Sequence, residues 1–255
     1  EGLYLMSTDN EIAIKTFIDK KDIEEIKEKG DLVVSGKLFY EIIRKLNNED
    51  INIEELVDSK LSIYTKNSSF TLNCNNTQDF PDLELTEKEK PVILNQKVFK
   101  TIINQTLFAT STQESRPVLT GINFKFANNK LECTATDSYR LAKKVVELEN
   151  LTEEYNIIIP TKNLTELIRM FNEQDDNLEL HIFDNKIVFK FGSIIMLSRI
   201  INGAYPDTSK LIPTEFSLIV RINLRDCYNA IDRASLLTNE SEKNTIKFET
   251  KNNSV

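Results

Sequence analysis

The sequence has few of the residues from which catalytic and metal sites are usually built. It contains one histidine, and its three cysteines are scattered, without a Cys-x-x-Cys pair. Because metal sites need clusters of such ligands, we expect neither a metal nor a cofactor. Cys74, Cys133 and Cys227 are expected to be free thiols in a reducing cytoplasm. His181 lies in the strand-like run "LELHIF", which favours a surface or packed strand residue over a catalytic base.

Glycine is also scarce, which argues against a nucleotide-binding loop. Only six glycines are present, and the segment "GDLVVSGKL" (30–38) departs from the phosphate-loop pattern. Five residues separate Gly30 from Gly36 where the pattern has four, and Leu38 stands where a Ser or Thr would hold Mg²⁺. No dinucleotide-binding fingerprint is present either.

Long apolar runs are missing as well. No segment approaches the about 20 residues of a membrane span, and no signal peptide opens the chain, so a cytoplasmic protein without membrane contact is expected. A net charge of −8 argues against a surface covered with phosphate-binding groups, although a basic stripe on an acidic body remains compatible with it. Because both ends lie in strand-like runs, we expect an internal piece of a longer protein.

Self-comparison reveals a repeat of about 125 residues. Four pairs of segments recur in the same order: "KLFYEIIRKLN" (37–47) with "KNLTELIRMFN" (162–172), "FPD" (80–82) with "YPD" (205–207), "STD" (7–9) with "ATD" (135–137), and 94–111 with 222–239. Solenoid repeats have periods of about 20–50 residues. The longer period therefore predicts duplicated whole domains, with a third copy only begun.

Each copy shows the pattern of two helices and several hairpins. Apolar side chains recur at helical spacing in 37–47, 162–172 and 97–108. The positions of the last segment that are expected to face the core are Val98, Phe99, Ile102 and Ile103. Strand-like runs separated by Asn-Asn, Asp-Asn and Lys-Asn pairs indicate hairpins. Without βαβ alternation, the predicted fold class is α+β, with repeated domains that each place two helices on antiparallel sheets.

The polar faces of the predicted helices are neutral to basic. Segment 97–108 shows Lys97 and Lys100 without a carboxylate, and 162–172 shows Lys162 and Arg169 against Glu166. For a single helix, a solvated face with ion pairs one turn apart is sufficient explanation. Because equivalent helices carry the same sign, helices arranged side by side would form one basic surface suited to a phosphate backbone.

The segment "ATDSYRLA" (135–142) is the densest polar cluster. Its central side chains are Asp137, Ser138, Tyr139 and Arg140. A Ser138-based hydrolase with Tyr or Arg as helper is one interpretation, but the spacing supplies no general base. A turn whose aspartate accepts hydrogen bonds from local amides is the other. The first copy keeps Thr8 and Asp9 but not the residues after them, so the Thr-Asp pair is interpreted as architectural and the following residues as specialised.

Four long motifs carry a family resemblance. The segments "TSTQESRPVLTGINF" (110–124), "CTATDSYRLA" (133–142), "GAYPDTSKLIP" (203–213) and "AIDRASLLTNESEKNTIKF" (230–248) closely resemble the bacterial DNA sliding clamp, the beta subunit of DNA polymerase III. The resemblance covers essentially the whole chain in order. It implies three clamp-fold domains per subunit and a ring of two subunits, with helices lining the hole and sheets outside. Residues 1–87 would be the later part of domain one, 88–213 all of domain two, and 214–255 the start of domain three.

The resemblance also implies a groove that binds short linear motifs of partner proteins. Carried over position by position, its residues are Leu119, Thr136, Ser138, Tyr139, Arg140, Leu141, Pro206, Lys210 and Leu211. The four apolar positions would form a socket, and Arg140 and Lys210 would meet a peptide carboxylate or carbonyl at its rim. Many relatives have His in place of Tyr139 and Arg in place of Lys210, so partner preference would differ.

DNA contacts implied by the resemblance are sparse and directed to phosphates, without reading of bases. The candidates are Lys97, Lys100, Gln113, Arg116, Lys162 and Arg169. The expected function is that of a non-catalytic processivity factor. Its expected partners are duplex DNA, the alpha-type replicative polymerase subunit, the clamp loader and other proteins with a clamp-binding motif, and the expected assembly is a homodimer. A monomeric peptide-binding scaffold is the alternative.

Overall fold

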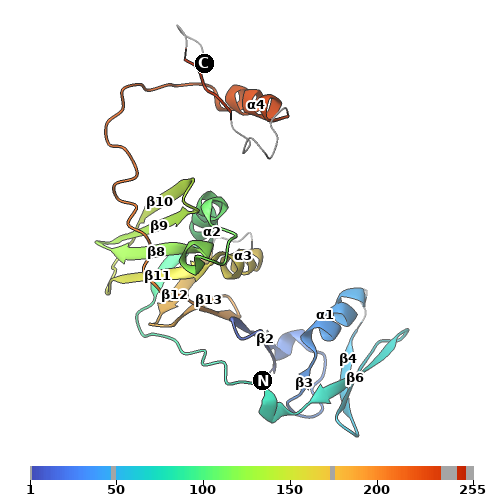
Figure 1. Cartoon of the computed structure of the whole chain (residues 1–255). Helices are drawn as coiled ribbons and strands as arrows, with labels where there is room; N and C mark the ends of the chain where they lie inside the picture. The colour runs from blue at the N-terminus through green and yellow to red at the C-terminus, as the bar shows by residue number, and fades with distance from the viewer. Residues whose placement is uncertain (1, 47–49, 173–175, 237–245, 251–255) are drawn as a thin grey trace. The chain divides into compact units, whose positions relative to one another are not determined.

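The computed structural model describes residues 2–46, 50–172, 176–236 and 246–250 (Figure 1). The chain divides into two compact units, Glu1–Tyr205 and Pro206–Val255. Within the described residues, the first unit contains three antiparallel sheets and three α-helices, and the second contains one α-helix.

A six-stranded sheet runs through the first unit and includes strands from both copies of the repeat. Its order is β1 (Gly2–Thr8), β2 (Ile12–Asp19), β14 (Ile194–Arg199), β13 (Lys186–Phe191), β12 (Asn177–Ile182) and β7 (Val92–Asn95). The copies meet where β2 pairs with β14, with Ala13 opposite Leu197. One sheet thus spans the junction between them.

A four-stranded sheet belongs to the second copy of the repeat. Its order is β10 (Leu141–Glu147), β9 (Lys130–Thr136), β8 (Gly121–Ala127) and β11 (Tyr155–Pro160). Asn128 and Asn129 connect β8 to β9 with φ of 52° and 54°, which is the backbone of a tight hairpin turn that Asn tolerates well. The Asn-Asn hairpin predicted here is confirmed.

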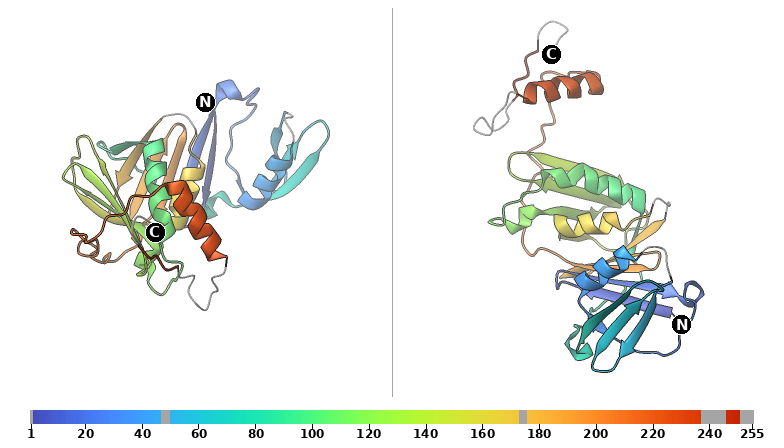
Figure 2. Two further views of the ribbon diagram at one scale, coloured as in Figure 1. Left: turned by 90° about the horizontal axis from the view of Figure 1, so that it is seen from above. Right: turned by 90° about the vertical axis from the view of Figure 1, so that its right-hand side faces the viewer.

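Helices α2 (Gln96–Thr106) and α3 (Thr161–Arg169) lie side by side over these sheets (Figures 1 and 2). Phe99 of α2 is fully buried and contacts Phe124 of one sheet and Phe189 of the other, with ring centroids 6.0 and 5.9 Å apart. The two sheets and two helices therefore share one core. Val98, expected to face that core, is 40% exposed. That expectation was wrong, because helical spacing alone marks a stripe wider than the contact that α2 makes.

The third sheet belongs to the first copy. Its order is β3 (Val33–Val34), β6 (Ser69–Asn75), β5 (Lys60–Tyr64) and β4 (Asn52–Leu56). Helix α1 (Gly36–Lys45) packs Phe39, Ile42 and Ile43 against its buried Leu61 and Ile63. Residue 47, at the end of the predicted helix, lies outside the described residues. The short 3₁₀ turns of the unit are η1 (Lys20–Asp22), η2 (Thr77–Asp79), η3 (Leu107–Ala109) and η4 (Pro117–Thr120).

In the second unit, α4 (Leu224–Ser235) repeats the start of α2. The Asn223 side chain accepts hydrogen bonds from the N–H groups of Arg225 and Asp226, as Asn95 does from Lys97 and Val98. The predicted match of 222–239 with 94–111 thus has a common N-cap, while residues 237–239 lie outside the described part. None of the helices in the described ranges is long and apolar enough to cross a membrane.

Candidate functional site

The segment after β9 is a tight turn held by Asp137. Asp137 Oδ1 accepts the N–H groups of Tyr139 and Arg140, both at 3.0 Å, and Oδ2 lies 3.0 Å from Arg140 Nε. Burial opposes ionisation of the carboxyl, but the two N–H donors and the guanidinium outweigh it and lower the pKa of Asp137 below its ordinary value. The aspartate therefore shapes the turn and fixes Arg140.

The first copy builds the same turn from Thr8 and Asp9. Asp9 Oδ1 accepts the N–H groups of Glu11 and Ile12 at 3.0 and 2.8 Å, and the Thr8 hydroxyl donates to Ile12 O at 2.8 Å. The Thr136 hydroxyl likewise donates to the Arg140 carbonyl at 2.7 Å. The third residues of the two turns are both in the left-handed region, with φ of 72° at Asn10 and 76° at Ser138. The architectural role predicted for the Thr-Asp pair is confirmed.

What differs between the copies is the set of side chains that the turn presents. Tyr139 is 90% exposed. The Arg140 guanidinium carbon lies 5.8 Å from the centre of the Phe108 ring, a cation-π distance. Ser138 Oγ accepts a hydrogen bond from Arg116 Nη1 at 3.4 Å. In the described part of the chain no histidine or carboxylate hydrogen-bonds to Ser138, so nothing there activates it as a nucleophile.

Tyr205 anchors the turn to the end of the unit. Its hydroxyl accepts the N–H of Thr136 at 3.0 Å, and burial raises the pKa of Tyr205 although that N–H acts in the opposite direction. The chain reaches this point through Gly203, whose φ of 139° disfavours any residue with a Cβ atom. The tyrosine of the Tyr-Pro-Asp segment, where the first copy has Phe80, is therefore a structural support for the turn.

The predicted groove residues are divided between the two units. Six of them, from Leu119 to Leu141, lie in the first unit, where η4 and the Asp137 turn carry them. Leu119 is only 3% exposed, whereas Leu141 is half-buried at the start of β10. Pro206, Lys210 and Leu211 lie in the second unit, with exposed side chains. The apolar socket that combines the two sets stays a prediction.

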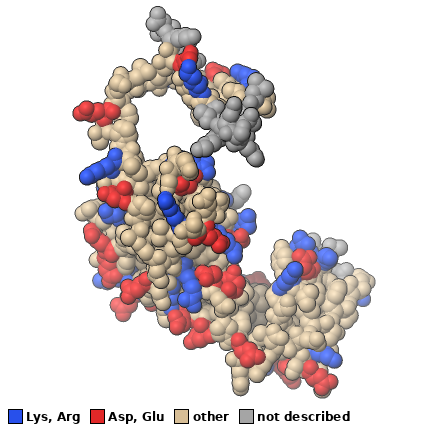
Figure 3. Space-filling model, in the orientation of Figure 1, with Lys and Arg blue, Asp and Glu red and all other residues tan. Residues whose placement is uncertain are grey.

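The predicted DNA-facing residues are exposed and lie on α2, α3 and one loop. Lys97 and Lys100 are on α2, Lys162 and Arg169 are on α3, and Gln113 and Arg116 are in the loop before η4. Carboxylates accompany the α3 pair, since Arg169 Nη1 lies 2.7 Å from Glu166 Oε1 and Lys162 Nζ 3.8 Å from Asp9 Oδ2. In Figure 3, acidic side chains gather along the left edge of the same unit, the side formed by the strands.

One group in the described residues has the composition of a metal site. Oxygens of Glu87 and Glu179 and a nitrogen of His181 lie within 4.8 Å of one another. However, His181 Nδ1 already accepts the N–H of Lys88 at 2.8 Å, and Glu87 is bound by Lys190 Nζ at 2.6 Å. His181 Nε2 lies 3.3 Å from Glu179 Oε2. Two members of the group are therefore engaged with lysine residues rather than arranged as a set of free ligands.

Comparison with known proteins places these features in a family. Residues 1–84 match the model of the DNA polymerase III beta subunit N-terminal domain, and residues 93–207 match that of its central domain. The beta sliding clamp of Staphylococcus epidermidis is 39% identical over 255 residues, covering 98% of this chain and 68% of that protein. The chain belongs to the bacterial beta sliding clamp family.

Solved structures of this family have the same fold. The DNA polymerase sliding clamp of Bacillus subtilis superposes with a TM-score of 0.88 and 34% identity, covering 94% of this chain and 64% of that one. The beta chain of DNA polymerase III from Streptococcus pneumoniae gives 0.87 and 31%, covering 93% and 64%. This clamp-family chain therefore spans slightly less than two thirds of the solved relatives. The predicted clamp fold and family are confirmed.

Two parts of the site could not be identified from the sequence of this clamp-family chain. The first is Phe108, whose ring contacts the Arg140 guanidinium. Its spacing in the sequence indicates only an apolar position of a helix and gives no sign of a cationic partner. The segment after "FPD" reads as a charged linker, although its leucines and glutamates dock on the six-stranded sheet. Its alternation of Leu and Glu at 83–85 was the available signal.

Proposed function

We propose that this protein is a DNA sliding clamp, a non-catalytic processivity factor that encircles duplex DNA as a homodimeric ring. Family membership supports this proposal, and the exposed lysines and arginine of the adjacent helices α2 and α3 are the observation that carries it. In the same proposal, residues 1–87, 88–213 and 214–255 belong to three successive clamp domains, and the protein works in the cytoplasm without a metal or cofactor.

Binding to DNA is proposed to be loose and independent of sequence. Exposed Lys and Arg side chains attract phosphates in solvent of high dielectric constant, where each contact is weak and screened by salt. Glu166 on α3 and Asp9 in the turn between β1 and β2 compete with phosphate for the basic side chains of α3. Enclosure by a ring, rather than adhesion, then keeps the protein on the duplex while it slides.

Partners are proposed to bind at the groove whose first-unit part is the Asp137 turn. Exposed Tyr139 and the fixed guanidinium of Arg140 support this assignment, because they offer an aromatic surface and a cation to a short peptide. The proposed partners are the alpha-type replicative polymerase subunit, the clamp loader, which hydrolyses the ATP, and other proteins that carry a clamp-binding motif.

The test uses the full-length protein loaded on nicked circular DNA by a clamp loader with ATP. We expect the protein to stay with the circle through gel filtration and to be released when a restriction enzyme linearises it. Linear DNA of the same length with both ends blocked by bound protein is the matched control and should retain the clamp. Equal retention on open linear DNA would indicate adhesion, and no retention on the circle would indicate a monomeric scaffold.

A further inference from the structure

The linker after the first "FPD" crosses the face of the six-stranded sheet opposite the helices. Strand residues alternate between two faces, and Ala13, Val188 and Leu197 form a small buried cluster away from the helix-side core. Leu83 and Leu85 of the linker pack against this cluster. Because residues 82–88 cover this face, we name them the strap.

Charged and polar contacts hold the strap at several points. Lys186 Nζ donates to the carbonyl of Glu84 at 2.8 Å and lies 3.0 Å from its carboxylate, and Lys190 Nζ lies 2.6 Å from Glu87 Oε2. The Lys88 N–H is the donor to His181 Nδ1. The two leucines, at alternate positions, therefore contact an apolar cluster, and the two glutamates contact two lysines. The strap is held on the face of the sheet by apolar contacts and by opposite charge.

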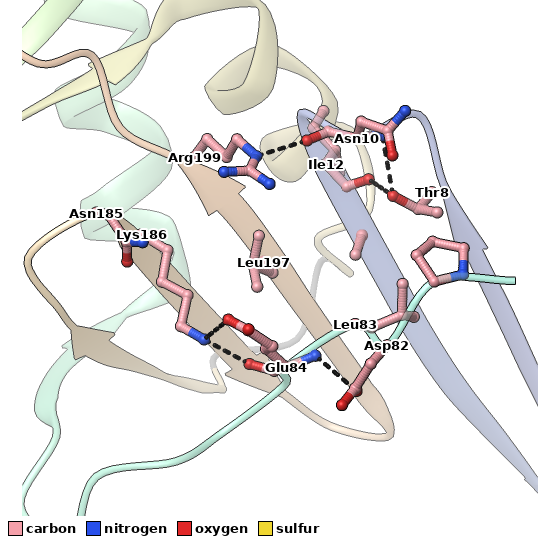
Figure 4. Close-up of a pocket in the computed structure, with 12 residues that line it drawn as sticks. Thr8, Asn10, Ile12, Asp82, Leu83, Glu84, Asn185, Lys186, Leu197 and Arg199 are labelled. Carbon is pink, nitrogen blue, oxygen red and sulfur yellow. Dashed lines mark hydrogen bonds and ion pairs between the residues drawn. The ribbon is translucent and has the colours of Figure 1, made fainter.

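The strap lies in the first copy of the predicted groove. A hollow of about 220 Å³ beside it is lined by Thr8, Asp82, Leu83, Lys186 and Leu197, among others (Figure 4). By the repeat, Thr8 corresponds to Thr136, and Pro81, which also lines the hollow, to Pro206, two residues of the predicted groove of the second copy. Figure 4 shows Asp82, Leu83 and Glu84 running over the strands that carry Leu197 and Ile12.

The two copies differ in the residues after the shared Pro-Asp. The first continues Leu-Glu-Leu at 83–85, and the second continues Thr-Ser-Lys at 208–210. The second segment lacks the leucines and acids that contact the sheet in the first. Alternating leucine and glutamate thus follow the shared Pro-Asp in the first copy but not in the second.

We propose that the outer face of β2, β14 and β13 is a second peptide-binding site, which takes acidic extended peptides with leucines at alternate positions and whose resident ligand is the strap. Because a tethered ligand acts at millimolar effective concentration, the strap keeps this copy closed. Partner peptides are left with the second copy, a consequence that rests on the proposed function, whereas the strap site itself does not.

The first experiment supplies the strap in trans. The probe is a fluorescein-labelled peptide with the sequence of residues 81–88, PDLELTEK, and its anisotropy is measured with this chain and with the Leu83→Ser/Leu85→Ser variant. We expect saturable binding to the variant and at least about tenfold weaker binding to the wild type, whose site is occupied. A peptide with both leucines replaced by serine is the matched control and should not bind. Equal affinity of variant and wild type, or no binding to a variant that keeps its circular dichroism spectrum, would overturn the proposal.

The second experiment keeps the strap leucines and so does not depend on that variant folding. Lys186→Met retains the apolar stem but loses the charge, and hydrogen exchange of the strap amides is followed by mass spectrometry. We expect them to exchange at least about fivefold faster, because a charge-assisted contact has been removed. The control is Lys143→Met, which removes a comparable ion pair with Glu132, 2.6 Å away, between β10 and β9. It should leave the exchange rates of the strap amides unchanged. Unchanged strap exchange in Lys186→Met would contradict the proposal. Neither experiment involves DNA, so failure here leaves the ring proposal standing.

Discussion

Replacing Asp137 should loosen the turn that presents Tyr139 and Arg140. A hydrogen bond to a charged acceptor contributes about 1.5–3 kcal/mol, and Asp137 Oδ1 accepts two at 3.0 Å in a partly exposed turn. Two such bonds would sum to about 3–6 kcal/mol, but both are exposed to water, which replaces part of each bond, so we expect Asp137→Ala to lower the local free energy of opening by about half of that sum, about 1.5–3 kcal/mol. The two amides should then exchange about 10- to 150-fold faster. Asp137→Asn keeps a neutral acceptor and should cost roughly 1 kcal/mol, or about fivefold.

The same turn has a pH dependence of known sign. The pKa of Asp137 is lower in the folded chain than in the unfolded one, so its contribution to stability is present above the unfolded value of about 3.9. That contribution is lost as the pH falls through the folded value. Protection factors of the amides at 139 and 140 should be equal at pH 7 and pH 5 and lower at pH 3, and those of Asp137→Asn should change less.

The assay is native-state hydrogen exchange resolved by residue, and the first copy provides the control. Asp9→Ala removes the equivalent pair of bonds at 3.0 and 2.8 Å. It should accelerate exchange at Glu11 and Ile12 and leave the second turn unchanged. If Asp137→Ala leaves the amides at 139 and 140 as protected as in the wild type, the carboxylate does not hold the turn, and the assignment of Arg140 as a fixed rim residue is wrong.

Two further predictions concern the core and the groove. Phe99→Ala should destabilise the first unit by about 3–5 kcal/mol, since Phe99 is fully buried and contacts three other aromatic rings. Urea unfolding followed by far-UV circular dichroism measures this loss of stability, and an unfolding midpoint within error of the wild type would refute it. Leu211→Asp in the full-length protein should abolish binding of a polymerase-tail peptide, measured by fluorescence anisotropy. The variant should keep the wild-type stability in urea, because Leu211 is 64% exposed. Unchanged peptide affinity would remove Leu211 from the predicted groove.

Much of the fold could be predicted because local patterns and tertiary structure agree. The helices, the Asn128-Asn129 hairpin and the duplicated Thr-Asp turn each follow from spacing or turn chemistry that acts within a few residues. For His181, the sequence predicted a strand residue that is either on the surface or packed, and could not decide between the two. His181 is 1% exposed, and its Nδ1 accepts the N–H of Lys88, 93 positions away. Strand alternation carries no information about such a distant segment.

The candidate site was harder to predict for the same reason. Asp137 and Arg140 are neighbours in sequence, and their turn was anticipated as one alternative. Phe108 and Tyr205 approach that turn from 28 or more positions away, through contacts that only the folded sheet creates. The strap was missed because alternating leucine and glutamate over three residues is too short a pattern to distinguish a docked segment from a solvated linker.

The pairing of β2 with β14 has a consequence for how successive copies can diverge. The two copies are joined by main-chain N–H and C=O groups along a shared sheet, and every amino acid except proline supplies both groups. Side chains of this seam that are not buried can therefore change without breaking the main-chain pairing of the two copies, so long as the backbone stays extended. Such a seam transmits the twist of one module to the next whatever its surface residues have become.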